Sequence, residues 1–241
     1  MRRRAKAPTT DPLGPPVPMA LRAPVRTLWE QRRTVMATET YQGLPLVKLP
    51  EDLRIYEHLL EEATPDVVVE IGAYGGGSAL WFRDRLRTLA AYGRSTAARV
   101  VSIDIDTARA REGLDRADPS WADSITLVDG DVTDPTLPER VAALLPDGAR
   151  CLVSEDGAHE LDTTAAALRG FARFVGPGGF FVVEDGVVDD EAARLPYWPR
   201  GVVPAIDAFL ASQDGAGWVV RRDVERYGLT TNPGGVLQRR P

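Results

Sequence analysis

The chain has 241 residues, 44% of them hydrophobic, one cysteine and a net charge of −6. This length and apolar content suit one globular α/β domain with an additional arm, and the single Cys151 excludes an internal disulfide. No apolar run is long enough to span a bilayer, and the basic start lacks the apolar segment of a secretory signal. We therefore expect a cytoplasmic protein with no membrane association.

Charge is unevenly distributed along the chain. Residues 1–33 carry eight basic and two acidic residues, whereas the remainder carries 21 basic and 33 acidic residues. An acidic body argues against a nucleic-acid-binding surface. The prolines and arginines of the start predict an N-terminal arm over residues 1–40, followed by the folded domain at 41–241. Because the basic arm can reach an acidic neighbour, we expect a homo-oligomer.

Predicted helices and strands alternate along most of the chain. We expect helices at 27–38, 51–63, 78–92, 138–145, 163–174 and 203–212, and strands at 67–72, 99–105, 124–128, 150–154, 180–183, 218–222 and 235–239. Strands that alternate with helices indicate a parallel sheet covered on both faces, and the last two strands read as an antiparallel hairpin. The predicted fold is therefore α/β and Rossmann-like, with seven mostly parallel strands.

A glycine-rich turn follows the first buried strand. The strand contains Glu70, the turn runs from Gly72 to Gly76, and Ser78 is the predicted N-cap of the next helix. Glycines let the backbone turn sharply and approach a ligand without a Cβ clash. The free N–H groups at a helix start favour an anionic group. We therefore expect a ligand over Gly72, Gly76 and Ser78.

Two cofactors compete for this turn. A nicotinamide site needs Gly-x-Gly-x-x-Gly, and Gly72 and Gly77 fit that pattern while Tyr74 occupies the middle position. The wider turn, with Glu70 just ahead of it, looks more like a class I S-adenosylmethionine (SAM) methyltransferase. A turn that binds no ligand is the third interpretation.

Acidic residues follow five successive strands of the expected sheet. Carboxyl ends of parallel strands meet at one rim, where ligands bind. Carboxylates crowded together need cations or hydrogen-bonding hydroxyls. The acids are Glu70, Asp104, Asp129 and Asp131, Glu155 and Asp156, and Glu184 and Asp185.

The first of these acids suit a nucleoside. Glu70 is expected near the amino-acid moiety or its bridging waters. Asp104 is expected on the ribose, with Asp106 as the competitor because the register is uncertain. We place Gly130 and Asp131 near the adenine.

The last two strands suggest a metal site. Asp156, Glu184 and Asp185 offer only oxygen ligands with open positions, which suits Mg²⁺ because this ion keeps waters and accepts substrate oxygens. One cysteine and two histidines cannot supply a zinc site or a two-histidine iron site.

The chain resembles the rhamnosyl O-methyltransferase and cephalosporin hydroxylase-type family of SAM-dependent enzymes. The resemblance covers residues 43–239 and is carried by several motifs. They are Leu44-Pro-Leu-Val-Lys-Leu-Pro-Glu-Asp-Leu53, residues 65–72, Gly76-Gly77-Ser78, Ser102-Ile-Asp-Ile-Asp106, Asp156-x-x-His159, Val183-Glu-Asp185 and Tyr227-Gly-Leu-Thr-Thr-Asn-Pro-Gly-Gly235. The hydroxylase part of the family's name finds no support in these residues, because no redox-metal or flavin motif is present.

The resemblance implies a mechanism. Family members hold a divalent metal by an aspartate after the fourth strand and a Glu-Asp pair after the fifth, the positions of Asp156, Glu184 and Asp185. The metal would chelate two neighbouring oxygens of a small hydroxylated acceptor, for which we expect a sugar of a glycosylated natural product. His159 is the candidate general base. The equal alternative is a histidine that hydrogen-bonds a metal ligand or caps the next helix.

Three other functions stay open on the sequence. A catechol O-methyltransferase would use the same metal on an aromatic diol. A nicotinamide oxidoreductase would bind NAD. A non-catalytic partner subunit would bind SAM without turnover, although the intact acidic cluster argues against it.

Overall fold

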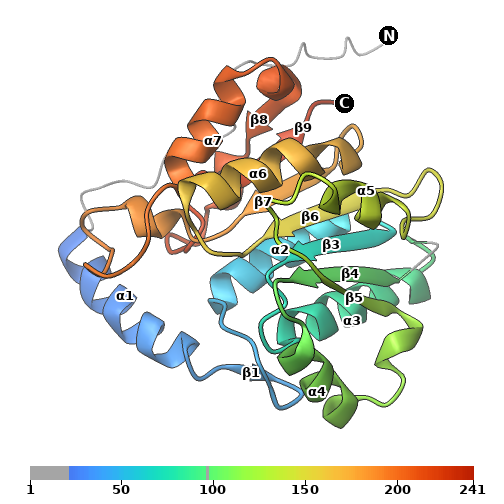
Figure 1. The fold of residues 1–241 in the computed structure, drawn as a ribbon. Helices are drawn as coiled ribbons and strands as arrows, with labels where there is room; N and C mark the ends of the chain where they lie inside the picture. Colours follow the sequence, from blue (N-terminus) through green and yellow to red (C-terminus); the bar gives the residue numbers. More distant parts are fainter. Residues whose placement is uncertain (1–21, 96–97) are drawn as a thin grey trace, which may run out of the picture.

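The computed structural model describes residues 22–95 and 98–241, so the first 21 residues of the predicted arm lie outside the described residues. Its centre is a seven-stranded sheet in the order β5-β4-β3-β6-β7-β9-β8 (Figure 1). The strands are β3 (Val67–Ile71), β4 (Arg99–Asp104), β5 (Ile125–Asp129), β6 (Cys151–Glu155), β7 (Phe180–Val183), β8 (Trp218–Val220) and β9 (Val236–Arg239).

The first five strands of this sheet run parallel. Strand β3 pairs with β4 from Val67↔Arg99 and with β6 from Val67↔Cys151, and β6 pairs with β7 up to Glu155↔Val183. This register brings the carboxyl ends of β3, β4, β6 and β7 to one rim. Strand β9 is antiparallel to both β7 and β8, which confirms the predicted C-terminal hairpin and the predicted fold class.

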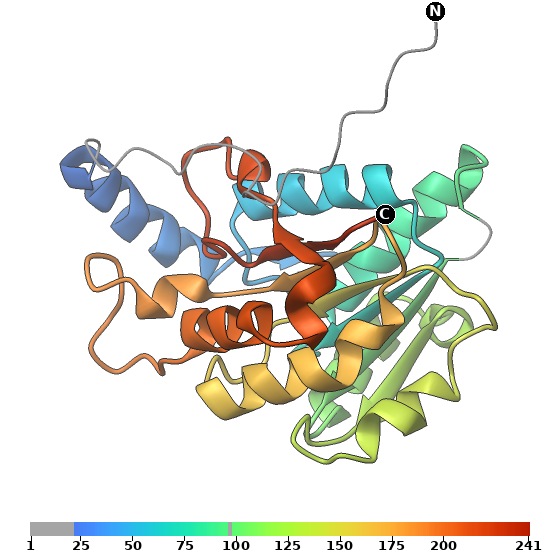
Figure 2. The same ribbon diagram turned by 90° about the horizontal axis from the view of Figure 1, so that it is seen from above.

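Helices cover both faces of the sheet (Figures 1 and 2). Apolar side chains of α2, α3 and α4 form one core with one face of the strands, and those of α5, α6 and α7 form a second core on the other face. Every residue of β3 is buried, as a parallel strand covered on both faces requires. The helices are α2 (Pro50–Ala63), α3 (Gly77–Ala91), α4 (Ala108–Ala117), α5 (Leu137–Ala142), α6 (Leu161–Phe171) and α7 (Val202–Ala211).

The described part of the N-terminal region packs on this body. Helix α1 (Arg22–Met36) begins earlier than predicted, because Pro24 lies in its first turn, where a missing N–H costs nothing. Trp29 contacts Trp198 edge to face at 6.4 Å and donates to the Ala193 carbonyl. The chain after α1 forms a hairpin of β1 (Thr40–Tyr41) and β2 (Leu44–Pro45). It turns at Gln42 and Gly43, which both have positive φ.

One local prediction at the glycine turn is wrong. The N-cap of α3 is Gly76, with φ +79°, and Ser78 lies inside the first turn of the helix. The left-handed conformation of the cap favours glycine, and an added Cβ there would lie 2.9 Å from Leu114. The N-cap of this helix therefore lies two residues before its predicted position. None of the helices in the described ranges is both long and apolar enough to cross a membrane.

Candidate active site

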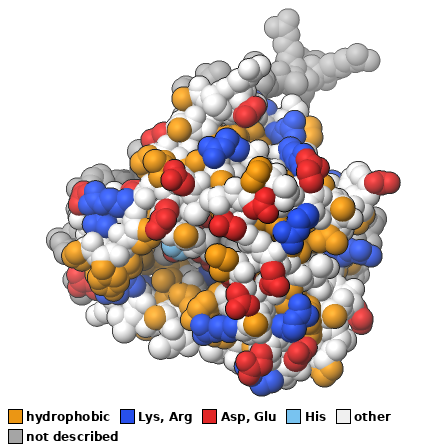
Figure 3. All heavy atoms as spheres, viewed as in Figure 1, with side chains coloured by type: hydrophobic (Ala, Val, Ile, Leu, Met, Phe, Trp, Pro, Cys, Tyr) orange, Lys and Arg blue, Asp and Glu red, His pale blue; other side chains and the backbone are white. Residues whose placement is uncertain are grey.

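A cavity of about 720 Å³ lies at the carboxyl rim of the sheet, within the usual range for small-molecule sites. Figure 3 shows a hollow with a histidine side chain inside it, on a face where acidic and basic side chains are interspersed. The cavity is lined by eight of the eleven predicted site residues: Gly72, Ser78, Asp104, Gly130, Asp131, Asp156, His159 and Asp185. Glu70, Gly76 and Glu184 are not among the lining residues.

Gly72 joins the glycine turn to the loop after β6. Its φ is +104°, and a Cβ added there would lie 2.0 Å from the backbone carbonyl oxygen of Asp156. The Asp156 N–H also donates to the Ile71 carbonyl at 2.8 Å. The glycine turn is therefore packed against the backbone of Asp156, a candidate metal ligand. The turn and the loop after β6 are thus held together where they line the cavity.

Asp104, rather than Asp106, faces the cavity. Its two carboxylate oxygens accept the backbone N–H groups of Tyr74 at 2.9 Å and Ile105 at 2.8 Å. Each oxygen keeps a lone pair for a ligand hydroxyl. Asp106 instead accepts the N–H of Ala108 at the start of α4. Of the two acids that the sequence left open, Asp104 is therefore the one that lines the cavity.

The loop after β5 supplies a further wall. Gly130 and Asp131 line the cavity, and Asp131 Oδ1 accepts the backbone N–H and the hydroxyl of Thr133. Asp129, the other acid at this strand end, accepts the N–H and hydroxyl of Thr107. These turns fix the loop beside the cavity.

Glu70 lies below the turn, 1% exposed, and accepts the Ser102 hydroxyl from the neighbouring strand. Burial raises the pKa of Glu70 to about 7. Any contact with a ligand would therefore pass through intervening groups, and its role as a cofactor residue stays a prediction.

The buried Glu70 predicts an unusual dependence of stability on pH. The unfolded chain loses the Glu70 proton near pH 4.5, whereas the folded protein keeps it until about pH 7. The folded state thus binds more protons in this window, and the free energy of unfolding falls as pH rises, by at most about 1.4 kcal/mol per pH unit. Glu70→Gln should reduce this slope in thermal unfolding of the ligand-free protein. The control Glu112→Gln, exposed on α4, should leave it unchanged; equal slopes in both variants would contradict the prediction.

Asp156, His159 and Asp185 form a compact group of possible metal ligands. One ligand atom from each lies within 4.8 Å of the others. His159 Nε2 is 3.3 Å from Asp185 Oδ2 and 3.9 Å from Asp156 Oδ1. His159 and Asp185 both have φ +57°, a conformation that is costly for a residue with a Cβ and is concentrated at functional sites.

The charges of this group affect one another. Burial lowers the pKa of His159, but the carboxylates of Asp185 and Asp156 outweigh it and raise the pKa above its usual value. Burial raises the pKa of Asp185, and the histidine opposes that rise. Burial also acts against ionised Asp156, yet the Lys48 ammonium holds its pKa below the ordinary range. Each of these three side chains therefore changes the proton affinity of the other two.

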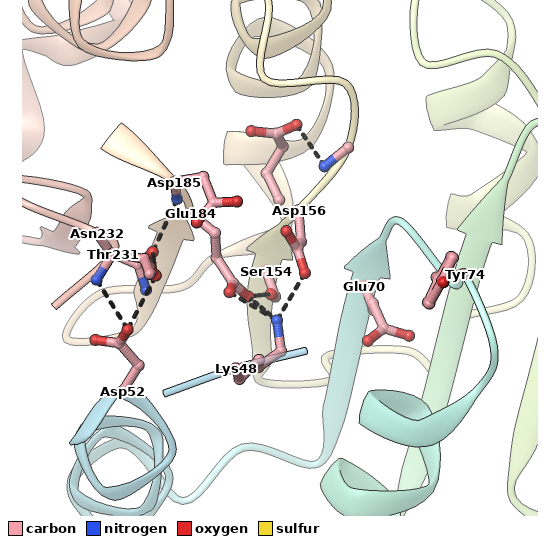
Figure 4. Close-up of polar contacts among 12 residues, drawn as sticks. Lys48, Asp52, Glu70, Tyr74, Ser154, Asp156, Glu184, Asp185, Thr231 and Asn232 are labelled. Atoms are coloured by element: carbon pink, nitrogen blue, oxygen red, sulfur yellow. Dashed lines mark hydrogen bonds and ion pairs between the residues drawn. The ribbon is translucent and has the colours of Figure 1, made fainter. Parts of the chain in front are cut away.

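The Glu184 carboxylate points toward Lys48 (Figure 4). Glu184 is 2% exposed. Its carboxylate accepts hydrogen bonds from the Lys48 ammonium at 2.6 Å, the Tyr56 hydroxyl at 2.6 Å and the Ser154 hydroxyl at 2.9 Å. Lys48 also donates to Asp156 Oδ2 at 2.8 Å. Lys48 lies within a motif of the family resemblance, and no local pattern in the sequence predicts these contacts.

A second set of buried polar groups fixes Asp185. The Asp185 N–H donates to Asn232 Oδ1 at 2.8 Å, and the Thr231 hydroxyl lies 2.8 Å from the same oxygen. Asp52 of α2, 1% exposed, accepts the N–H and hydroxyl of Thr231 at 2.9 Å and the hydroxyl of Thr230. The C-terminal motif therefore holds the loop after β7 in place.

The sheet order, the glycine turn and the rim lined by acidic residues define a class I methyltransferase. The family model "Rhamnosyl O-methyltransferase/CmcI" matches residues 33–240. The chain belongs to this family, and it is an O-methyltransferase of the SAM-dependent class I type.

Individual relatives agree with this assignment. The chain is 26% identical over 215 residues to the rhamnosyl O-methyltransferase of Mycobacterium tuberculosis, covering 88% of this chain and 82% of that protein. It is 26% identical over 216 residues to the enzyme of that name from Mycobacterium leprae, covering 88% of each.

Solved structures show the same fold. A structure of CmcI with Mg and SAM has a TM-score of 0.62 at 24% identity, covering 85% of this chain and 78% of that one. The O-methyltransferase TomG of Streptomyces achromogenes, in complex with SAM, has a TM-score of 0.52 at 18% identity, covering 81% of this chain and 82% of that one.

Proposed function

We propose that this O-methyltransferase transfers the methyl group of SAM to a sugar hydroxyl of a glycosylated natural product, with Mg²⁺ bound at the carboxylate rim. One observation carries the proposal: a single cavity contains both the nucleoside-type residues and the Asp156–His159–Asp185 group. The names of the curated relatives support a rhamnosyl acceptor, and the CmcI structure with Mg and SAM supports the pairing of the two ligands.

The methyl donor fits the side of the cavity formed by the loops after β3, β4 and β5. Asp104 would accept the ribose hydroxyls, and Gly130 and Asp131 would lie beside the adenine. The start of α3, near Gly72 and Ser78, would lie against the amino-acid moiety, because N–H groups at a helix start favour a carboxylate.

The donor set at the rim fits a hard divalent cation. Asp156 and Asp185 offer carboxylate oxygens that face the cavity, as Mg²⁺ prefers. When bound, Mg²⁺ supplies a positive charge that orients a vicinal diol and lowers the pKa of its hydroxyl. Glu184 completes the ligand set only where Lys48 releases it.

His159 is the proposed general base. Transfer forms the bond from the acceptor oxygen to the methyl carbon and breaks the bond from that carbon to the sulfur of SAM. The hydroxyl proton passes to His159 Nε2, which lies at the rim beside Asp185. The rest of the cavity wall positions the two reactants, and positioning contributes much of the rate of such a transfer.

The assignment of His159 predicts a specific kinetic result. His159→Gln should lower kcat by about 10²–10⁴-fold, the usual contribution of a general base, and leave the Kd of SAM unchanged. His58→Gln is the matched control, because His58 lies on α2 and contacts the Tyr227 hydroxyl at 2.8 Å. Unchanged turnover in His159→Gln would exclude His159 as the base and favour its structural role.

An acceptor screen tests the proposed function. We expect SAM and Mg²⁺ to yield a singly methylated rhamnosyl glycoside, with EDTA abolishing the product. Methylation of catechols but not of glycosides would support the catechol alternative. SAM binding without methylation of any acceptor would indicate a non-catalytic subunit.

A further inference from the structure

Lys48 places an ammonium group inside the acidic rim. Its side chain is 4% exposed, and Nζ lies 2.6 Å from Glu184 Oε1 and Oε2 and 2.8 Å from Asp156 Oδ2 (Figure 4). This single cation thus bridges two of the three proposed metal ligands. It also lines the cavity, so the cation and an incoming metal share one space.

The backbone around Lys48 is fixed. The Lys48 N–H donates to the Leu46 carbonyl at 2.9 Å, and both Leu46 and Leu49 are buried. Helix α2 begins at Pro50, directly after this segment. The backbone of Lys48 is therefore held in place by the fold.

Glu184 has a full set of partners without any metal. In addition to the Lys48 ammonium, the Tyr56 and Ser154 hydroxyls donate hydrogen bonds to its carboxylate. A buried carboxylate without such partners would be strongly destabilising. A divalent cation that uses Glu184 must therefore replace the ammonium at this carboxylate.

We infer that Lys48 is a resident cation of the acidic rim that keeps the metal-free enzyme folded and competes with the divalent metal for Glu184. The inference rests on the proposed metal site. Lys48 is then a positioning residue that sets the affinity for the metal, so the enzyme binds Mg²⁺ reversibly. When the metal leaves, the Lys48 ammonium offsets the repulsion between the carboxylates and keeps the site folded.

Lys48→Met tests the inference, because methionine is an unbranched side chain one atom shorter than lysine and carries no charge. We expect the metal-free variant to unfold at a lower temperature than the wild type. We expect its Mg²⁺ affinity, measured by calorimetry, to rise by at least about tenfold, because a positive charge beside the ligands is gone. Saturating Mg²⁺ should recover much of the lost thermal stability.

The double variant Lys48→Met/Glu184→Gln is the matched control. Glutamine removes the charge that Lys48 neutralised, so the metal-free double variant should unfold at a higher temperature than Lys48→Met alone. It should also lose the gain in Mg²⁺ affinity. A double variant as unstable as Lys48→Met would overturn the inference.

The wild-type protein offers an independent measurement that needs no substitution. Lys48 is one of only two lysines in the sequence, so ¹⁵N labelling of lysine gives two Nζ signals. A buried, ion-paired ammonium should give a signal that shifts as Mg²⁺ is added. No change in either signal at saturating Mg²⁺ would overturn the competition.

The outcomes separate the two proposals. Wild-type protein that binds Mg²⁺, together with a Lys48→Met variant that binds it no more tightly, overturns the role of Lys48 and leaves the proposed function standing. Absence of Mg²⁺ binding in both proteins overturns the metal site and the inference with it.

Discussion

Asp185→Asn should nearly abolish methyl transfer while the protein stays folded. Asparagine keeps the shape of the side chain, so the φ of +57° and the N–H donated to Asn232 can persist. The substitution removes a negative charge from the Asp156–His159–Asp185 group. A bound metal supplies several kcal/mol to such a reaction, and each 1.4 kcal/mol is tenfold in rate. We therefore expect kcat/KM to fall by about 10³-fold or more.

The measurement is a transfer assay over a range of Mg²⁺ concentrations. The matched control is Asp207→Asn on the exposed face of α7, which makes the same chemical change away from the cavity. It should retain wild-type turnover. Asp185→Asn that transfers methyl groups at the wild-type rate, with the same Mg²⁺ dependence, would show that this carboxylate holds no catalytic metal.

Gly72→Ala should remove both ligands at once. The new Cβ would lie 2.0 Å from the Asp156 carbonyl oxygen, a contact with backbone that no side-chain rotation can relieve. Strain from the positive φ and forced movement of the loop should together lower the free energy of unfolding by about 3 kcal/mol or more. Because the loop carries Asp156, both SAM and Mg²⁺ binding should weaken in calorimetric titrations.

The control for this variant is Gly148→Ala. Gly148 also has a positive φ, +69°, but an added Cβ there meets nothing within 4 Å. Gly148→Ala should therefore lower the free energy of unfolding only through backbone strain, by about 1 kcal/mol. Equal losses of thermal stability in the two variants would contradict the packing of the glycine turn on the Asp156 backbone.

Much of the cavity could be predicted from the sequence, because its residues follow strands with clear apolar patterns. Asp104, Asp131, Asp156 and Asp185 each follow or end such a strand, and parallel strands bring their ends to one rim. The family motifs added His159. The predicted boundary between an arm at 1–40 and a domain at 41–241 stays a prediction.

The contacts that depend on long-range packing could not be predicted. Lys48 meets Glu184 across 136 positions of the chain, and no local pattern encodes that pairing. Asp52 and Thr231 are separated by 179 positions. One weak signal was present: a chain with 29 lysines and arginines has only two lysines, and Lys48 stands alone in an apolar, proline-bounded segment.

Local chemistry misled the prediction of one helix start. Ser78 has the side chain of a good N-cap, but close packing against Leu114 gives that position to Gly76. Glu184 was expected beside Asp185 in the metal group. In the structure its carboxylate is bound by Lys48, Tyr56 and Ser154, because successive residues at a strand end point in different directions. Its role as a ligand stays a prediction.

The most direct test of the account is a calorimetric titration of SAM into the wild-type protein, followed by Mg²⁺ into the SAM complex. We expect SAM to bind with micromolar affinity and Mg²⁺ to bind the complex at one further site, which is absent in Asp185→Ala. SAM binding without an Mg²⁺ site would leave a methyltransferase and remove the proposed role of the carboxylate rim. Absence of SAM binding, with NAD binding in its place, would contradict the central claim.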